Sequence, residues 1–156
     1  MSTSPVPYEA TLHVRDTCLC LHAQRAARAL ARRYDEALRP LGLTSGQFSL
    51  LMSLNRPAPP TIGAVAALLA MDRTTLTANL KPLQRRGLLA VVPDPADRRG
   101  RRLVLTRAGQ DLLAAALPVW ERTQAEAARD LPNPDGVRAA LRRLGRAPDD
   151  AMIPGS

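Results

Sequence analysis

Apolar residues recur every three or four positions in six stretches of the chain, which is the spacing of α-helices with one buried face. The first stretch predicts a helix over about residues 16–38 that ends before Pro40 and Gly42. Its apolar or small side is formed by Leu19, Ala23, Ala26, Leu30, Tyr34 and Leu38. Most of its arginines fall on the other side of the helix, where water would solvate them.

Three short helices are predicted next, each with a capping side chain at its start. Thr44 and Gln47 have the spacing of a capping box, and Thr61 and Asp72 would cap the following two helices. The third of these helices covers about residues 73–86, and the leucines on its inward side are Leu76, Leu80 and Leu83.

The pattern changes between Gly87, which stops the third short helix, and Thr106. An apolar run at residues 88–92 leads into a polar turn with proline, glycine and four arginines, and an alternating run at residues 103–105 leads out of it. This alternation predicts a two-stranded ribbon whose charged tip stays in water. Short helices followed by a basic ribbon are typical of a winged helix, a fold that reads DNA.

Two more helices are predicted after the ribbon. The first covers about residues 106–130, with Thr106 as its cap and a bend at Pro118, and the second opens with Asn133 and Pro134. The helices near both ends of the chain carry more apolar surface than a small winged domain can cover. We therefore expect them to pair with a second copy of the chain as a homodimer.

The predicted fold is mainly α with a small β-wing. A winged helix-turn-helix domain is flanked by N- and C-terminal dimerisation helices. The expected boundaries are a flexible arm over 1–12, a folded region over 13–145 and a flexible tail over 146–156, with the winged helix at about 44–106 and dimerisation helices at about 16–38 and 107–145.

Composition and charge favour nucleic acid as the partner. The net charge is +8, and Lys81 is the only lysine, so arginine supplies almost all of the positive charge. A small protein with this charge attracts polyanions. No apolar run approaches the roughly 20 residues that span a bilayer, and residues 1–10 lack the pattern of a secretion signal. We therefore expect a soluble cytoplasmic protein without a membrane partner.

The sequence offers little that indicates catalysis. No clustered Ser/His/Asp set, phosphate loop or metal-spaced ligand set is present. An enzyme is therefore not expected, and neither a cofactor nor a metal is implied.

In its central and wing segments the chain resembles the MarR family of transcription regulators, over about residues 15–130. The matching residues are Arg39 to Thr44 with Gln47 and Phe48, Asp72 to Leu80, Leu83 to Leu88, Asp94 to Arg99, and Leu103 to Gly109. The resemblance implies a dimer built from the first, fifth and sixth predicted helices, with two winged modules on a pseudo-palindromic DNA site. It also implies a cleft for small effectors and, most often, a repressor.

The predicted DNA contacts lie on the third short helix and on the wing. The N-terminal half of such a helix enters the major groove, where arginine suits guanine and threonine suits a hydroxyl contact or a thymine methyl. Base contacts are expected from Arg73, Thr74, Thr75, Thr77 and Asn79, although Asn79 also fits a position too far round the helix. Phosphate contacts are expected from Lys81 and Arg86, and groove contacts of the wing from Arg98, Arg99 and Arg101.

The two details of the wing that matter most are its tip arginine and its aspartate. By the resemblance, Arg99 is the residue at the tip that enters the minor groove. Asp97 is expected to brace the turn by pairing with a neighbouring arginine. Two copies of the module would read half-sites about 10 bp apart.

Two cysteines raise the alternative of a redox-sensing regulator. Cys18 and Cys20 are two positions apart on the predicted first helix, so they would point to different sides and could not bridge. In peroxide-sensing members of the family a reactive cysteine lies early in the first helix, and the resemblance places Cys20 there with Tyr34 as an activating tyrosine. Gln24 and Ser45 stand in place of the other tyrosines, which favours cysteines that pack as small apolar residues.

The last candidate site is a pocket for a small aromatic or acidic effector. Its expected lining is Phe48, Met52 and Trp120, with His22 or Arg25 as a polar partner, although the same apolar residues also suit a core. An effector that prefers a splayed dimer would release DNA. Three functions stay open: a sequence-specific regulator, a redox-sensing regulator acting through Cys20, and a non-specific architectural DNA-binding protein.

Overall fold

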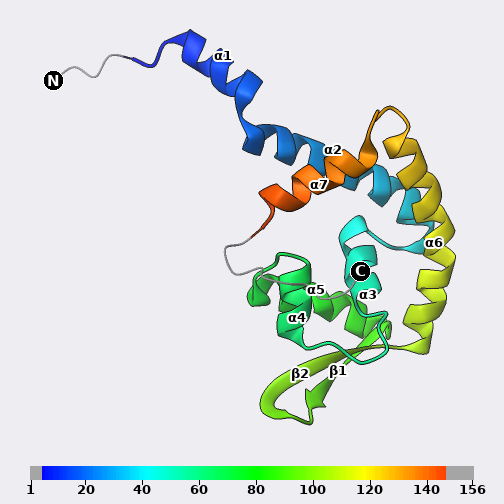
Figure 1. The fold of residues 1–156 in the computed structure, drawn as a ribbon. Coiled ribbons are helices and arrows are strands. Elements are labelled where there is room, and N and C mark those ends of the chain that lie inside the picture. Colours follow the sequence, from blue (N-terminus) through cyan, green and yellow to red (C-terminus); the bar gives the residue numbers. More distant parts are fainter. Residues whose placement is uncertain (1–4, 147–156) are drawn as a thin grey trace. The chain divides into compact units, whose positions relative to one another are not determined.

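The computed structural model describes residues 5–146, and its contacts divide the chain into two units with the boundary after Thr123. The first unit holds most of the helices and a two-stranded sheet, and the second holds the end of helix α6 and helix α7 (Figure 1). The helices of the described chain are α1 (Tyr8–Thr17), α2 (Leu19–Leu38), the 3-10 turn η1 (Arg39–Leu41), α3 (Ser45–Ser53), α4 (Ile62–Leu68), α5 (Arg73–Arg85), α6 (Arg107–Ala128) and α7 (Pro134–Leu144). The strands are β1 (Leu89–Asp94) and β2 (Asp97–Leu105). This arrangement confirms the mainly α fold with a small β-wing.

The N-terminal helix differs from its prediction, because the chain breaks at Cys18. This residue is extended, with φ −69° and ψ 110°, and its sulfur accepts the backbone N–H of Leu21 at 3.4 Å as the cap of α2. Hydrogen bonds between a side chain and nearby backbone compete with a continuous helix. The Thr17 hydroxyl forms another bond of this kind, to the carbonyl of His13. One continuous helix over 16–38 is therefore wrong, and residues 8–12 of the expected flexible arm are helical.

The predicted caps of the three short helices are confirmed. Thr44 and Gln47 form a reciprocal capping box, with both of its hydrogen bonds at 3.1 Å. The Thr61 hydroxyl accepts the N–H of Ala64 at 3.1 Å. Each cap satisfies backbone donors that have no partner inside the helix, so the starts of α3 and α4 are set by local sequence.

A leucine-rich core joins α2–α6 to the base of the wing. Only 3% of the chain is aromatic, so branched aliphatic side chains fill the interior. The largest fully buried side chains are Leu38, Leu50, Leu51, Val65, Leu76, Leu83, Leu89 and Leu103. The three predicted inward leucines of α5 are all buried, which fixes the opposite side of that helix toward solvent.

The wing is an antiparallel pair of strands with a short addition. Leu89 pairs with Leu105 and Val91 with Leu103, so the apolar positions of the two strands share the core-facing side. The segment before α4 adds to the sheet, because the N–H of Leu103 donates to the carbonyl of Pro60 at 2.9 Å. Sequence patterning did not predict this addition, since a single bridging residue has no period.

Thr106 links the end of α5 to the start of α6. Its hydroxyl accepts the N–H of Gly109 at 3.1 Å, which confirms the predicted cap, and donates to the carbonyl of Gly87 at 2.6 Å. Gly87 has a left-handed φ of +71°, a conformation that glycine adopts without strain. The wing therefore leaves α5 and re-enters α6 at a single hydrogen-bonded junction.

In the second unit, α7 begins as predicted. The side chain of Asn133 accepts the N–H of Gly136 at 3.0 Å, and Pro134 takes the first helical position. Val137, Leu141 and Leu144 recur along this helix and are exposed. The predicted tail lies outside the described residues from position 147 onward. Among residues 5–146, no helix combines the length and apolarity needed to cross a membrane.

Candidate nucleic-acid interface

The N-terminus of α5 is organised by Asp72. Its carboxylate accepts the backbone N–H of Thr75 at 2.8 Å and the Thr75 hydroxyl at 2.9 Å. These two hydrogen bonds, the backbone one first, hold the pKa of Asp72 below its usual value. The exposed side of the helix that follows carries Arg73, Thr74, Thr75, Thr77, Ala78, Asn79 and Lys81.

This cap predicts an acid-dependent loss of stability. A carboxyl whose pKa is lowered by folding stabilises the protein above its unfolded pKa of about 4, and that contribution is lost as the pH falls through the lower folded pKa. In Asp72→Asn the cap is kept but cannot titrate. We expect the two proteins to have similar thermal midpoints at neutral pH, and the midpoint of the wild type to fall further when the pH is lowered. Thermal melts followed by circular dichroism from neutral pH to below about pH 4 test this. Midpoints that fall equally with pH in the two proteins would contradict it.

Apart from its cap Asp72, the exposed side of α5 has no neighbouring carboxylate in the sequence. No aspartate or glutamate occurs between Asp72 and Asp94. The guanidinium of Arg73 lies over Gly63 in the first turn of α4, where an added Cβ would come 2.7 Å from its Nη2. Because Gly63 has no side chain, the Arg73 guanidinium can lie against the first turn of α4.

Two predicted DNA contacts have partners within the chain. The Thr75 hydroxyl donates to Asp72, so its hydrogen is already used. The Arg86 guanidinium donates to the carbonyl of Gly42 at 2.8 Å, which ties the end of α5 to the turn after η1. Both side chains are exposed. Their contacts with DNA stay predictions, and each also has a structural role that the pattern did not indicate.

The end of the wing differs from the expected arginine-bearing turn. The turn consists of Pro95 and Ala96, and Arg98, Arg99 and Arg101 belong to β2. Asp94 pairs with Asp97, and Pro93 pairs with Arg101. The three residues between those pairings, Arg98, Arg99 and Gly100, are therefore in excess on β2 and form a bulge. A bulge turns side chains away from the pairing of the two strands. Arg98, Arg99 and Arg101 all have exposed side chains.

Asp94, rather than Asp97, is the carboxylate that pairs with an arginine. It accepts the N–H of Ala96 at 3.0 Å and Nε of Arg102 at 3.0 Å, which in this order lower its pKa. Arg102 also donates to the carbonyl of Pro59 at 2.6 Å. Asp97 instead accepts the backbone N–H of Arg99 at 3.0 Å. The expected pairing of Asp97 was wrong because turn-forming aspartates bond to backbone two residues on.

These contacts give the four wing arginines different roles. Arg102 is half-buried and clips the wing to the segment before α4. Arg98, Arg99 and Arg101 have exposed side chains and no ion pair with a described carboxylate. Figure 1 shows the wing beside α4 and α5 within the first unit. The helix face and the arginine-bearing strand are thus presented together by one rigid core.

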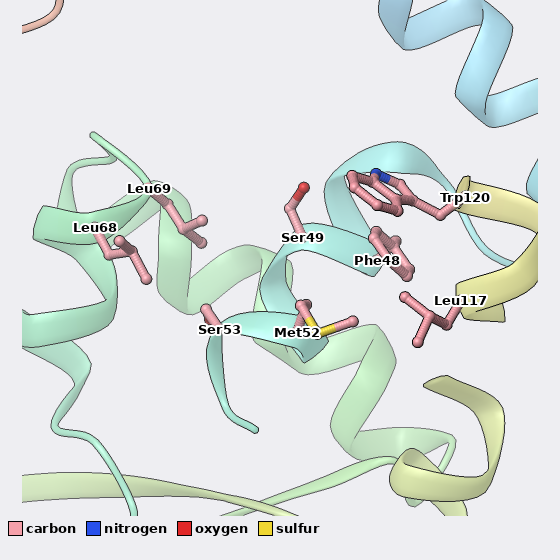
Figure 2. Close-up of a pocket in the computed structure, with 8 residues that line it drawn as sticks. All are labelled: Phe48, Ser49, Met52, Ser53, Leu68, Leu69, Leu117 and Trp120. Atoms are coloured by element: carbon pink, nitrogen blue, oxygen red, sulfur yellow. The ribbon is translucent and has the colours of Figure 1, made fainter. Parts of the chain in front are cut away.

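A cavity of about 460 Å³ lies among α3, α4 and α6 (Figure 2). It is lined by Phe48, Ser49, Met52, Ser53, Leu68, Leu69, Leu117 and Trp120. The rings of Phe48 and Trp120 are stacked, with centroids 6.3 Å apart and planes at 17°. Three of the five predicted effector residues line it, whereas His22 and Arg25 do not. Sequence reasoning missed the two serines and the leucines, since only the packing of three helices brings them together.

The candidate redox residues are not brought together within one chain. Cys20 is exposed, and its sulfur accepts a hydrogen bond from Nε2 of Gln24 at 3.4 Å. Tyr34 lies 14 positions further along α2, about 21 Å away along the axis. Nδ1 of His22 donates to the carbonyl of Cys18 at 2.7 Å. In the described part of the chain, no cluster of three or more potential metal ligands occurs.

Exposed α5, capped at Asp72, and the arginine-bearing ribbon after it define a winged helix-turn-helix protein. Residues 41–100 match the model of the MarR family. The chain belongs to the MarR family of transcription regulators. It is similar to the Mycobacterium tuberculosis transcriptional regulator MosR, solved in complex with DNA, with 40% identity and a TM-score of 0.77 over 83% of this chain and 94% of that one.

Two other relatives show the range of regulators that the chain resembles. The transcriptional repressor CouR, solved bound to a 23-mer DNA duplex, is 26% identical with a TM-score of 0.77, over 92% of this chain and all of that one. The transcriptional activatory protein BadR of Rhodopseudomonas palustris is 33% identical over 62% of this chain and 53% of its own length. The chain spans about half the length of the curated relatives it matches. These relatives are named as transcription regulators and not as enzymes.

Proposed function

We propose that this chain represses transcription as a homodimer that binds a pseudo-palindromic DNA operator and is released by a small-molecule effector. The observation that carries the proposal is that a single unit carries both the exposed side of α5 and the exposed arginines of β2. A helix of this kind fits the major groove, and the wing arginines fit the narrow minor groove next to it. Such a protein acts on DNA in the cytoplasm.

The homodimer is supported by exposed apolar side chains near both ends of the described chain. Val14, Leu19 and Leu30 are exposed on α1 and α2, and Leu141 and Leu144 on α7. Large apolar side chains in water are costly when they form stripes. A two-fold pair would cover them, and it would also place two copies of α5 on the two halves of a palindrome.

Release by an effector is supported by the cavity among α3, α4 and α6. Its volume and apolar lining lie within the range of small-molecule sites. It joins α4 of the winged module to α6, so an occupant that prefers a different spacing of these helices shifts the population away from the DNA-binding form. We favour repression over activation because CouR, to which the chain is similar over 92% of its length, is named a repressor.

Selection of bound sequences from random duplex DNA tests this function directly. We expect a pseudo-palindrome with half-sites about 10 bp apart, bound by a species that light scattering measures as two chains. Recovery of unrelated sequences, with affinity governed by salt alone, would instead support the architectural alternative. A single chain that ignores duplexes at low salt would overturn both.

A further inference from the structure

A second cavity of about 360 Å³ adjoins the first. It lies among the end of α3, the end of β2 and the first turns of α6. It is lined by Met52, Asn55, Leu105, Gln110, Leu113, Ala114 and Leu117. No part of the DNA-binding surface described above uses these residues.

Met52 and Leu117 line both cavities. Figure 2 shows the Met52 side chain extending toward Leu117, with Phe48 and Trp120 on one side of this pair. A methionine thioether is unbranched and adapts to irregular space. Met52 and Leu117 therefore belong to the boundary between the two cavities, and the flexible Met52 side chain can rearrange there.

The chemistry of the two cavities differs. Among the described residues, no arginine, lysine, aspartate or glutamate lines either of them. In the first, the Ser53 hydroxyl already donates to the carbonyl of Leu50 at 2.6 Å, so it offers only its oxygen as an acceptor. In the second, Asn55 and Gln110 offer amide donors and acceptors, and neither amide has a partner among residues 5–146.

We propose that the two cavities form one composite site for an uncharged ligand with an apolar, planar body and a hydrogen-bonding amide, carbonyl or hydroxyl group. The planar body lies beside Trp120, and the polar group passes Met52 to reach Asn55 and Gln110. A carboxylate or ammonium is disfavoured because no described residue that lines either cavity offers it an opposite charge. This inference rests on the proposed effector function and replaces the acidic ligand that the sequence also allowed.

The position of the second cavity links its occupant to the wing. Leu105 is the last residue of β2, and Gln110 lies in the first turn of α6. Between them, Thr106 holds the junction through Gly87 and Gly109. A ligand that bonds to Gln110 and contacts Leu105 therefore acts on the place where the wing enters α6.

The fluorescence of Trp120, the single tryptophan of the chain, reports occupancy of the first cavity without DNA. The probes are 3-phenylpropanamide, 3-phenylpropanoate of nearly the same shape, and propylbenzene, which lacks the polar group. We expect the amide to bind at least about tenfold more tightly than the carboxylate. Equal binding of the amide and the carboxylate, or no binding of any probe, would overturn the proposal.

Two variants of the second cavity test where the polar group of the ligand binds. Asn55→Leu and Gln110→Leu are expected to weaken binding of 3-phenylpropanamide about tenfold, because the amide loses a hydrogen-bonding partner, and to leave propylbenzene within about twofold. Gln24→Leu is the matched control, since this exposed glutamine lies outside both cavities. Unchanged amide binding in both cavity variants would overturn the composite site. Binding that leaves the operator complex intact would instead contradict only the proposed release by an effector.

Discussion

Arg99→Ala is expected to weaken binding to every duplex by about 10- to 100-fold near physiological salt, because a dimer loses two guanidinium groups at once. Arg99 is exposed in the bulge of β2, and its backbone N–H is held by Asp97. The side chain is thus carried on an anchored backbone. Minor-groove contacts of this kind read charge and groove width more than base identity, so specific and random DNA should lose affinity alike.

The salt dependence gives a second measure of the same variant. Each phosphate charge neutralised contributes about 0.9 to the slope of log affinity against log salt. We expect the slope to fall by about two for a dimer of Arg99→Ala. Fluorescence anisotropy with labelled duplexes over a salt series measures both quantities. Arg122→Ala is the control, since it removes the same charge from an exposed position on α6.

Arg73→Ala tests the role of α5 in DNA binding separately from the role of the wing. Arg73 opens α5 and lies over Gly63, at the end of the helix that faces base edges in winged modules. Its loss is expected to change the preferred base at one position of each half-site. An equal loss of affinity on specific and random DNA for both variants would refute this division of roles between α5 and the wing.

Gly109→Ala is expected to lower the free energy of unfolding by about 3 kcal/mol or more, which is large for the addition of one methyl group. Gly109 is buried in the first turn of α6. An added Cβ would come 2.1 Å from the carbonyl oxygen of Leu88 and 2.7 Å from Cδ1 of Leu105. The same Leu88 carbonyl accepts the N–H of Thr106 at 3.2 Å. Because the obstacle is backbone, α6 has to move away from the start of the wing.

A second glycine supplies the matched control for this change. Gly46 lies in the first turn of α3, and an added Cβ there would have only the Thr44 hydroxyl, at 4.0 Å, for a neighbour. Gly46→Ala is expected to be neutral or to stabilise the protein by up to about 1 kcal/mol, because alanine is the better helix former. Urea unfolding followed by circular dichroism compares the two. A Gly109→Ala protein as stable as the wild type would contradict the close packing of α6 on Leu88.

Local sequence was sufficient for the short helices and the wing strands. The capping box of Thr44 and Gln47 and the caps Thr61, Asp72 and Asn133 were all predicted, because a cap depends on residues within three positions of it. Alternation of apolar positions placed the wing for the same reason. The break of the first helix was missed, since the bond from Leu21 to the sulfur of Cys18 has no common sequence signal.

The sequence by itself therefore determined the class of fold, the exposed side of α5 and the positive charge of the wing. Only the tertiary structure decided which wing arginine is structural, because Arg102 is held by Asp94 and by the carbonyl of Pro59, which is 43 positions away. It likewise decided that Phe48, Met52 and Trp120 border a cavity without His22 or Arg25. Periodicity reports which side of an element is buried, but the partner on that side is set by packing between distant segments.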